Sequence, residues 1–198
     1  MYIMKRRRIQ AKDEEEEEEE KKNIKVVNNR IYFYADVNRK SVLELNIALQ
    51  ELRDKMKSTI CELDVNSPNI YLYIHSHGGD VYAGLSAMDH IMKCDIPVVT
   101  IVDGFVASAA TLISLAGKRR LMYSHSQMLI HQIQTEMWGR YEELVDEMAN
   151  TKVLQDKMRD IYTTLAKIPK TVLDKLMKKE VTLTAEECKK YSIVDEVM

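Results

Sequence analysis

The 198-residue chain is long enough for one domain and a tail, and its composition, 45% hydrophobic and 30% charged, is typical of a soluble globular protein. Its 29 Lys and Arg are balanced by 31 Asp and Glu, so it has no cationic excess to neutralise phosphates, which argues against a nucleic-acid-binding protein. The three cysteines, Cys61, Cys94 and Cys188, are widely spaced, which favours reduced thiols over a disulfide framework.

Residues 1–24 are predicted to form a charged tail. The basic block Lys5–Arg8 is followed by Asp13 and the glutamates Glu14–Glu20. Like charges repel and bury no apolar surface, so the tail is expected to be disordered in isolation, while residues 25–198 form the folded domain. No apolar segment follows the basic block, and no stretch reaches the length of a membrane span, so a cytoplasmic protein is expected.

The first half of the domain alternates strands with helices. A strand is predicted over 31–35, and the capping box Ser41–Glu44 predicts the start of a helix. A polar, turn-rich segment over 60–68 leads to a second strand at 70–74, apolar on both faces and therefore expected to be buried. A helix over about 82–93 follows the pair Gly78-Gly79.

The second half continues the alternation. Strands are predicted over 98–102, ending at Gly104, and at 121–123, 128–130 and 193–194. Helices are predicted over 108–116 and 141–165, with two short ones opening near Thr171 and Thr184. This order predicts an α/β fold with a mostly parallel sheet, in which ligands bind at the carboxyl ends of the strands.

Ser108 lies among small residues where a strand gives way to a helix. A serine hydroxyl is a weak nucleophile that needs a hydrogen-bonded base, and a helix N-terminus favours the anion that develops during attack. The alternative interpretation is an ordinary N-cap serine in a helix that packs through small residues. The local sequence does not separate the two.

His131 and the pair Gly78-Gly79 follow two other predicted strands. An imidazole titrates near neutrality and suits a general base, although a histidine at a strand end is also a common structural residue. A backbone N–H of the glycine pair, together with that of Ala109, suits an oxyanion hole, and a tight turn is the alternative. His75 and His77 have no acidic or cysteine partners at metal-ligand spacing, so no metal or cofactor is predicted.

Four blocks together resemble the proteolytic subunit of the Clp protease. They are Tyr71–Gly79, Gly104–Ala110, Leu129–Gln132 and Leu183–Tyr191, and they occur in the family's order. The resemblance implies a crotonase-like α/β fold and a serine endopeptidase. It implies Ser108 as nucleophile, His131 as base, and Gly79 and Ala109 as oxyanion donors.

The resemblance also implies an assembly. Family members form homo-oligomeric, heptameric rings that stack around a chamber, and they work with a AAA+ unfoldase. Tyr71 and Tyr73 match tyrosines of the family's docking pocket for that partner, and the helix over 141–165 occupies the region that joins two rings.

Three departures from the family pattern stand out. Glu180 occupies the position of the triad aspartate, with Asp174 and Asp195 as the nearest alternatives. Ile133–Trp138 replaces the segment rich in proline and glycine that follows the catalytic histidine. The acidic tail replaces the N-terminal axial loop.

These departures leave other functions open. The divergence fits a phage-encoded member, which suggests a stand-alone capsid maturation protease as one alternative. A crotonase-type acyl-CoA enzyme and a catalytically inactive ring subunit are two more. Neither of the last two needs both Ser108 and His131, so the presence of the pair argues against them.

Overall fold

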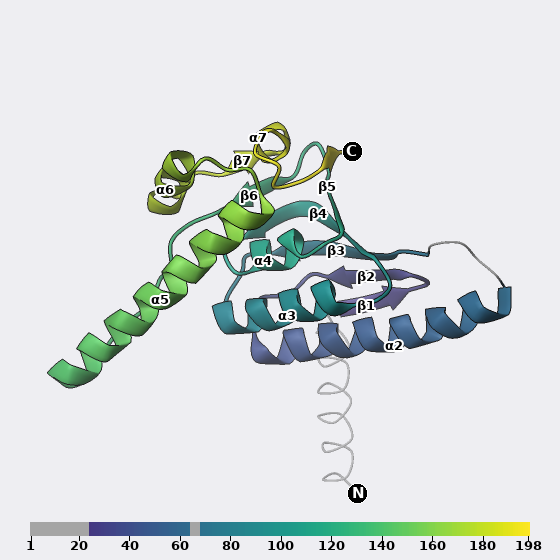
Figure 1. Ribbon diagram of the computed structural model, residues 1–198, viewed down its shortest axis with the longest axis horizontal. Helices are drawn as coiled ribbons and strands as arrows, with labels where there is room; N and C mark the ends of the chain where they lie inside the picture. Colours follow the sequence, from purple (N-terminus) through teal and green to yellow (C-terminus); the bar gives the residue numbers. More distant parts are fainter. Residues whose placement is uncertain (1–23, 64–67) are drawn as a thin grey trace, which may run out of the picture.

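The computed structural model describes residues 24–63 and 68–198 (Figure 1). The charged tail expected over 1–24 lies outside the described residues except for Ile24, which already begins the first strand. No helix in the described part of the chain is long and apolar enough to cross a membrane.

One mixed sheet forms the framework. Its path runs β1 (Ile24–Val27), β2 (Arg30–Phe33), β3 (Ile70–Ser76), β4 (Val98–Ala107), β5 (Arg119–Met122) and β8 (Glu196–Val197). Every neighbouring pair on this path is parallel except β1–β2. β6 (Gln127–Leu129) pairs in parallel with the end of β4, and β7 (Leu183–Thr184) pairs antiparallel with β6. The predicted α/β class with a mostly parallel sheet is confirmed.

Helices cover one face of this sheet and one end of it. The described helices are α2 (Arg39–Leu63), α3 (Val81–Lys93), α4 (Ala110–Leu115), α5 (Tyr141–Leu165), α6 (Lys170–Lys178) and α7 (Ala185–Lys190). α2 and α3 lie side by side below the sheet in Figure 1, and α4 lies between α3 and β4. α5 projects from the body, and its buried residues, Met158 and Tyr162, lie in its second half.

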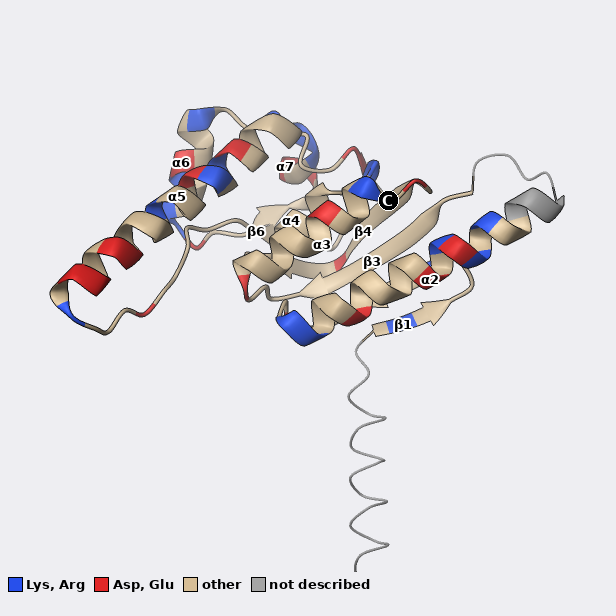
Figure 2. Cartoon of the chain, turned by 60° about the horizontal axis from the view of Figure 1, so that its bottom comes forward, with Lys and Arg blue, Asp and Glu red and all other residues tan. Residues whose placement is uncertain are grey.

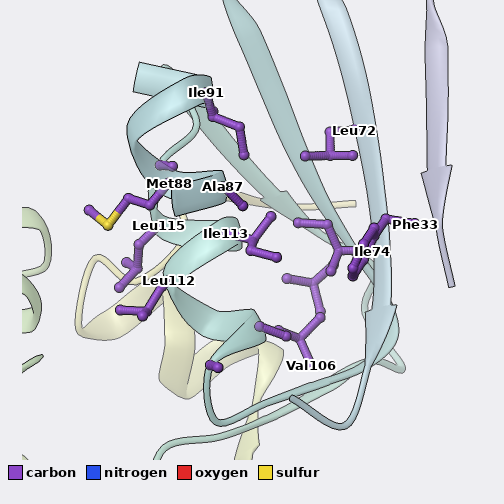
Figure 3. Close-up of a cluster of buried hydrophobic side chains, with 14 of the residues drawn as sticks. Phe33, Leu72, Ile74, Ala87, Met88, Ile91, Val106, Leu112, Ile113 and Leu115 are labelled. Atoms are coloured by element: carbon purple, nitrogen blue, oxygen red, sulfur yellow. The ribbon is translucent and has the colours of Figure 1, made fainter. Parts of the chain in front are cut away.

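The core lies between the sheet and these helices. Figure 3 shows Leu72 and Ile74 of β3 facing Ala87 of α3 and Ile113 of α4. Burial alternates strictly along β3, so Tyr71 and Tyr73 on the other face are only half-buried. The expectation that this strand is buried on both faces is therefore wrong, because helices cover one face only.

α2 begins earlier and ends later than predicted. Asn38 caps it, since its Oδ1 accepts from the N–H groups of Lys40 and Ser41 at 2.9 and 3.0 Å. Ser41 therefore lies inside the first turn and is not the cap, and its Oγ accepts from the N–H of Asn38. At the other end the helix continues to Leu63, into the segment predicted as turns, because the first helix-breaking proline is Pro68.

Two strands also differ from the prediction. β4 runs through Gly104 to Ala107, with Gly104 at φ +85°. A β-carbon at Gly104 would lie 2.8 Å from Nδ1 of His75 in β3, so the close approach of that side chain requires glycine. The glycine does not end β4. The last strand is Glu196–Val197, because Ile193 and Val194 are buried in the turn that follows α7.

Candidate active site

The three motifs meet at the carboxyl ends of three neighbouring strands. β3 and β4 are paired up to Ser76 and Val106, and β4 and β6 are paired up to Ala107 and Leu129. The glycine pair follows β3, Ser108 follows β4, and His131 lies two residues beyond the end of β6. The register therefore brings together segments that the sequence places at three separate strand ends.

Ser108 occupies a strained turn between β4 and α4. Its φ is +54°, a left-handed conformation that is uncommon for residues other than glycine. Its N–H donates to the carbonyl of Leu129 at 2.9 Å, which fixes the serine backbone against the strand that leads to His131. Ala109 is the N-cap of α4 and offers no side-chain cap, so Ser108 precedes the helix and is not its capping residue. The ordinary N-cap interpretation is therefore excluded.

The glycine pair lies directly against this turn. A β-carbon at Gly78 would lie 2.6 Å from Cβ of Ser108 and 2.7 Å from the carbonyl oxygen of Ala107. A β-carbon at Gly79 would lie 2.2 Å from the carbonyl oxygen of Val37. Both glycines have positive φ, so they combine a close approach of the backbone with a conformation that L side chains rarely adopt.

Two backbone donors remain available beside Ser108. Among the described residues, the N–H groups of Gly79 and Ala109 donate no hydrogen bond, although their neighbours Gly78 and Asp80 do. Ala109 is fully buried, and an unpaired buried N–H is costly unless a ligand satisfies it. The pair is chemically suited to a developing oxyanion.

His131 is half-buried and its ring is not fixed by a carboxylate. Nδ1 of His131 is buried and has no hydrogen-bond partner within residues 24–63 and 68–198. Its backbone is anchored from the next residue, because the N–H of Gln132 donates to the carbonyl of Met177, near the end of α6, at 2.8 Å. Within the described part of the chain, Oγ of Ser108 makes no hydrogen bond, so the serine and the histidine are close in the fold but not bonded. Such pairs often tighten only when substrate binds.

The three candidate carboxylates have other partners. Oε1 of Glu180 accepts from Nε2 of Gln134 at 2.9 Å, and both side chains are exposed. Asp174 faces Arg159 at 3.4 Å, between α6 and α5. Asp195 faces Arg120 at 2.6 Å across β5 and β8. Burial alone would raise the pKa of Asp195, but the hydrogen bonds and charge of Arg120 lower it overall, which keeps this carboxylate ionised and engaged.

Two residues at this site were not singled out from the sequence. Gln134 is the partner of Glu180, and nothing in its local sequence predicts that contact across 46 residues. Thr111 holds the carbonyl of Ser108, with Oγ1 at 2.5 Å and the backbone N–H at 3.0 Å. A threonine hydroxyl commonly donates to the carbonyl three residues earlier, so the spacing of Ser108 and Thr111 could have predicted this contact.

The face of the sheet away from the helices carries a line of aromatic rings. Tyr32 stacks on Tyr73 with ring centroids 4.8 Å apart, and Tyr34 stacks on His75 at 5.6 Å. The hydroxyl of Tyr34 donates to the carboxylate of Asp103, and burial together with this contact raises the pKa of Tyr34. We call Tyr32, Tyr34, Tyr71, Tyr73 and His75 the aromatic face.

In the described ranges, no group of three His, Cys, Asp or Glu residues could hold a metal ion.

Sequence comparisons identify related proteins. The family model described as Clp protease matches residues 16–198. An ATP-dependent Clp protease proteolytic subunit from Ostreococcus tauri is 33% identical over 172 residues, which cover 84% of this chain and 83% of the relative. The subunit of the same name from Bacteroides fragilis is 32% identical over 150 residues, which cover 72% of this chain and 71% of the relative.

A solved structure shares the fold. The chain superposes on a ClpP1 mutant from Listeria monocytogenes with a TM-score of 0.71 and 22% sequence identity. The match covers 83% of this chain and 88% of the other. The ClpP-type architecture expected from the four sequence blocks is confirmed.

Proposed function

This chain belongs to the Clp protease family of serine peptidases, and we propose that it cleaves peptide bonds through an acyl-enzyme on Ser108. The observation that carries the proposal is the surroundings of Ser108. A strained turn after β4 presents this serine beside Gly78 and beside two N–H groups with no described acceptor. The N–H of Ser108 donates to the carbonyl of Leu129, two residues before His131. An acyl-CoA enzyme of related fold is not favoured, because the curated relatives are proteolytic subunits.

The proposed reaction uses each of these groups in turn. Oγ of Ser108 attacks the peptide carbonyl carbon while His131 accepts its proton. The carbonyl oxygen becomes an oxyanion that accepts hydrogen bonds from the N–H groups of Gly79 and Ala109. Removing one such donor costs about 100- to 1000-fold in kcat in enzymes of this kind. The C–N bond then breaks as His131 protonates the leaving amine. Water, deprotonated by the same imidazole, attacks the acyl carbon, and the bond to Oγ of Ser108 breaks as His131 returns the proton to Oγ.

We propose Glu180 as the carboxylate that orients His131 during this cycle. Asp174 and Asp195 each face an arginine, whereas the one partner of Glu180 among the described residues is the neutral amide of Gln134. Glu180 also lies three residues after Met177, whose carbonyl holds the residue next to His131. Nδ1 of His131 has no acceptor in the described part of the chain. If the Glu180 carboxylate releases the amide of Gln134 and accepts from Nδ1 of His131 instead, it orients the imidazole.

Substitution of the two candidate carboxylates tests this assignment. Glu180→Gln is expected to lower kcat by about 100-fold or more, because an amide cannot stabilise the imidazolium. Asp174→Asn is the matched control, since it removes a negative charge from α6, which leads to Glu180, and kcat should stay within about 3-fold. Steady-state cleavage of a fluorogenic peptide measures both. If Asp174→Asn causes the larger loss, the orienting role belongs to Asp174.

Clp family proteolytic subunits form oligomeric rings and work with ATP-dependent unfoldases, and we propose the same for this chain as a homo-oligomer of heptameric rings. Two surfaces support it, one partly exposed and one exposed. The aromatic face includes Tyr71 and Tyr73, which match the family's docking tyrosines. The projecting half of α5 exposes apolar side chains, among them Tyr141, Val145, Met148 and Val153. Figure 2 shows acidic stretches alternating with uncharged stretches near the projecting end of α5.

Native mass spectrometry at low protein concentration tests the assembly. We expect a species several times the mass of one chain, because an apolar stripe on a projecting helix gains stability when a second copy covers it. A monomer peak alone at every concentration would contradict the ring. The Met148→Glu variant should shift the population toward smaller species, while the change of a charged neighbour, Glu147→Gln, should not.

Labelling with a fluorophosphonate tests the proposed chemistry. We expect the intact mass of the wild-type chain to increase by one adduct, because the reagent phosphonylates a serine only where a base activates it. The His131→Ala variant should react at least about 100-fold more slowly. A wild-type chain that takes up no label would contradict the proposal.

A further inference from the structure

Helix α5 is connected to Ser108 through a buried pair of hydroxyls. Tyr162 of α5 is fully buried, and its hydroxyl forms a hydrogen bond with Oγ1 of Thr111 in α4. Oγ1 of Thr111 in turn contacts the carbonyl oxygen of Ser108 at 2.5 Å. The three groups form one continuous line from the long helix to the proposed nucleophile.

The direction of these hydrogen bonds follows from their chemistry. A carbonyl oxygen can only accept, so Thr111 uses its single hydroxyl proton on Ser108. Tyr162 must therefore donate to Thr111. Burial raises the pKa of Tyr162 to about 12, so the phenol keeps the proton that it donates throughout the neutral range. Each donor in the line has an acceptor, and the line ends on the backbone of Ser108.

These hydrogen bonds restrain the backbone of Ser108, which has a strained conformation. Ser108 has φ +54°, and α4 spans only Ala110–Leu115 with no side-chain cap at its start. A strained conformation persists only where the surroundings over-determine it. The hydroxyl of Thr111 supplies one such restraint, and the phenol of Tyr162 fixes the rotamer of Thr111.

A second contact from α5 reaches the proposed base. Oε1 of Gln155 accepts from the N–H of Ile133, two residues after His131, at 2.9 Å. Nε2 of the same amide contacts Sδ of Met177 at 3.7 Å, and the carbonyl of Met177 holds Gln132. Gln155 and Tyr162 are seven residues apart, close to two helical turns, so they project from the same side of α5.

We propose that Tyr162 and Gln155 are positioning residues through which helix α5 holds the proposed nucleophile and the proposed base in register. This inference rests on the proposed function of Ser108 and His131. It assigns to α5 a role in the chemistry in addition to any role in assembly. Movement of α5 relative to the body would change the geometry at both Ser108 and His131.

Three hydroxyl variants test the connection to Ser108. Tyr162→Phe keeps the ring and removes the donor, and Thr111→Val keeps the shape and removes the hydroxyl. Each is expected to lower kcat by about 10-fold or more with KM within about 2-fold, because a displaced nucleophile affects the reaction more than binding. The double variant should be no slower than Thr111→Val, since Tyr162 acts through Thr111. Tyr82→Phe, on an exposed tyrosine of α3, is the control and should match wild type.

Two variants of Gln155 test the connection to His131. Gln155→Glu retains an acceptor for the N–H of Ile133, whereas Gln155→Leu does not. We expect the leucine variant to lose about 10-fold in kcat and the glutamate variant to retain kcat within about 3-fold. Rescue by the conservative change separates positioning from general packing.

All rates are divided by the number of sites that a fluorophosphonate labels, so a fraction of unfolded chains does not count as lost activity. Wild-type kcat per labelled site in Tyr162→Phe would overturn the inference, as would a double variant whose losses multiply. Labelling of Ser108→Ala would instead refute the proposed function. Loss of kcat in Tyr162→Phe and Gln155→Leu, with Ser108→Ala unlabelled, supports both.

Discussion

Ser108→Ala is expected to lower kcat for peptide cleavage by about 10⁵- to 10⁶-fold and to end labelling by a fluorophosphonate. The reason is that alanine has no group that can form the acyl-enzyme, and only binding and the oxyanion donors remain. His131→Ala should cost a similar amount, and the double variant should be no slower, because the two residues act as one unit.

The same substitution should leave the fold intact. Oγ of Ser108 makes no hydrogen bond among the described residues, and alanine keeps the Cβ that already occupies this left-handed conformation. The melting temperature of Ser108→Ala should therefore stay within about 2 °C of wild type. Ser124→Ala, on an exposed serine, is the matched control and should retain full activity. Cleavage by Ser108→Ala at more than about a hundredth of the wild-type rate would exclude the acyl-enzyme.

Gly78→Ala is expected to damage both stability and activity. The new β-carbon would lie 2.6 Å from Cβ of Ser108 and 2.7 Å from the carbonyl oxygen of Ala107, and φ at Gly78 is +97°. Overpacking and backbone strain together predict a loss of about 3 kcal/mol, which corresponds to a fall of roughly 6–12 °C in the melting temperature. Displacing Ser108 by even about 1 Å predicts a further 100-fold loss in kcat per folded molecule.

Gly139→Ala provides the control for Gly78→Ala. A β-carbon at Gly139 would meet Oε2 of Glu143 at 2.9 Å, which is the far end of an exposed side chain, and its φ is not in the left-handed region. Its melting temperature should fall by no more than about 4 °C. Differential scanning calorimetry and active-site-normalised peptide cleavage measure the two effects. An unchanged melting temperature for Gly78→Ala would contradict the close contact with Ser108.

The positions of the three site segments followed from the sequence because they depend on strand ends. Parallel strands bring their carboxyl ends to one edge of a sheet, so the sequence pattern alone groups Ser108, His131 and Gly79. The left-handed turn at Ser108 was not predictable in the same way. Its small neighbours suit either a helix start or a tight turn, and the choice depends on the pairing of Ser108 with Leu129.

The side-chain partners of the site could not be read from the sequence. Glu180 contacts Gln134 across 46 residues, and Tyr162 contacts Thr111 across 51 residues. Both contacts depend on the tertiary packing of α5 and α6, which local sequence does not encode. The periodicity of α5 marks Met158 for the core, but it does not distinguish a tyrosine that donates a buried hydrogen bond from one that fills space. The resemblance identified Glu180 as a candidate, and the competing carboxylates could be compared only once their arginine partners were known.

The acyl-enzyme on Ser108 is tested most directly by locating the fluorophosphonate adduct through fragmentation of the labelled peptides from wild-type protein. We expect a single phosphonylated residue, Ser108, and at most about a hundredth of that labelling rate in the His131→Ala variant. An adduct on a different residue, such as Ser76 or Thr111, with Ser108 unmodified, would contradict it.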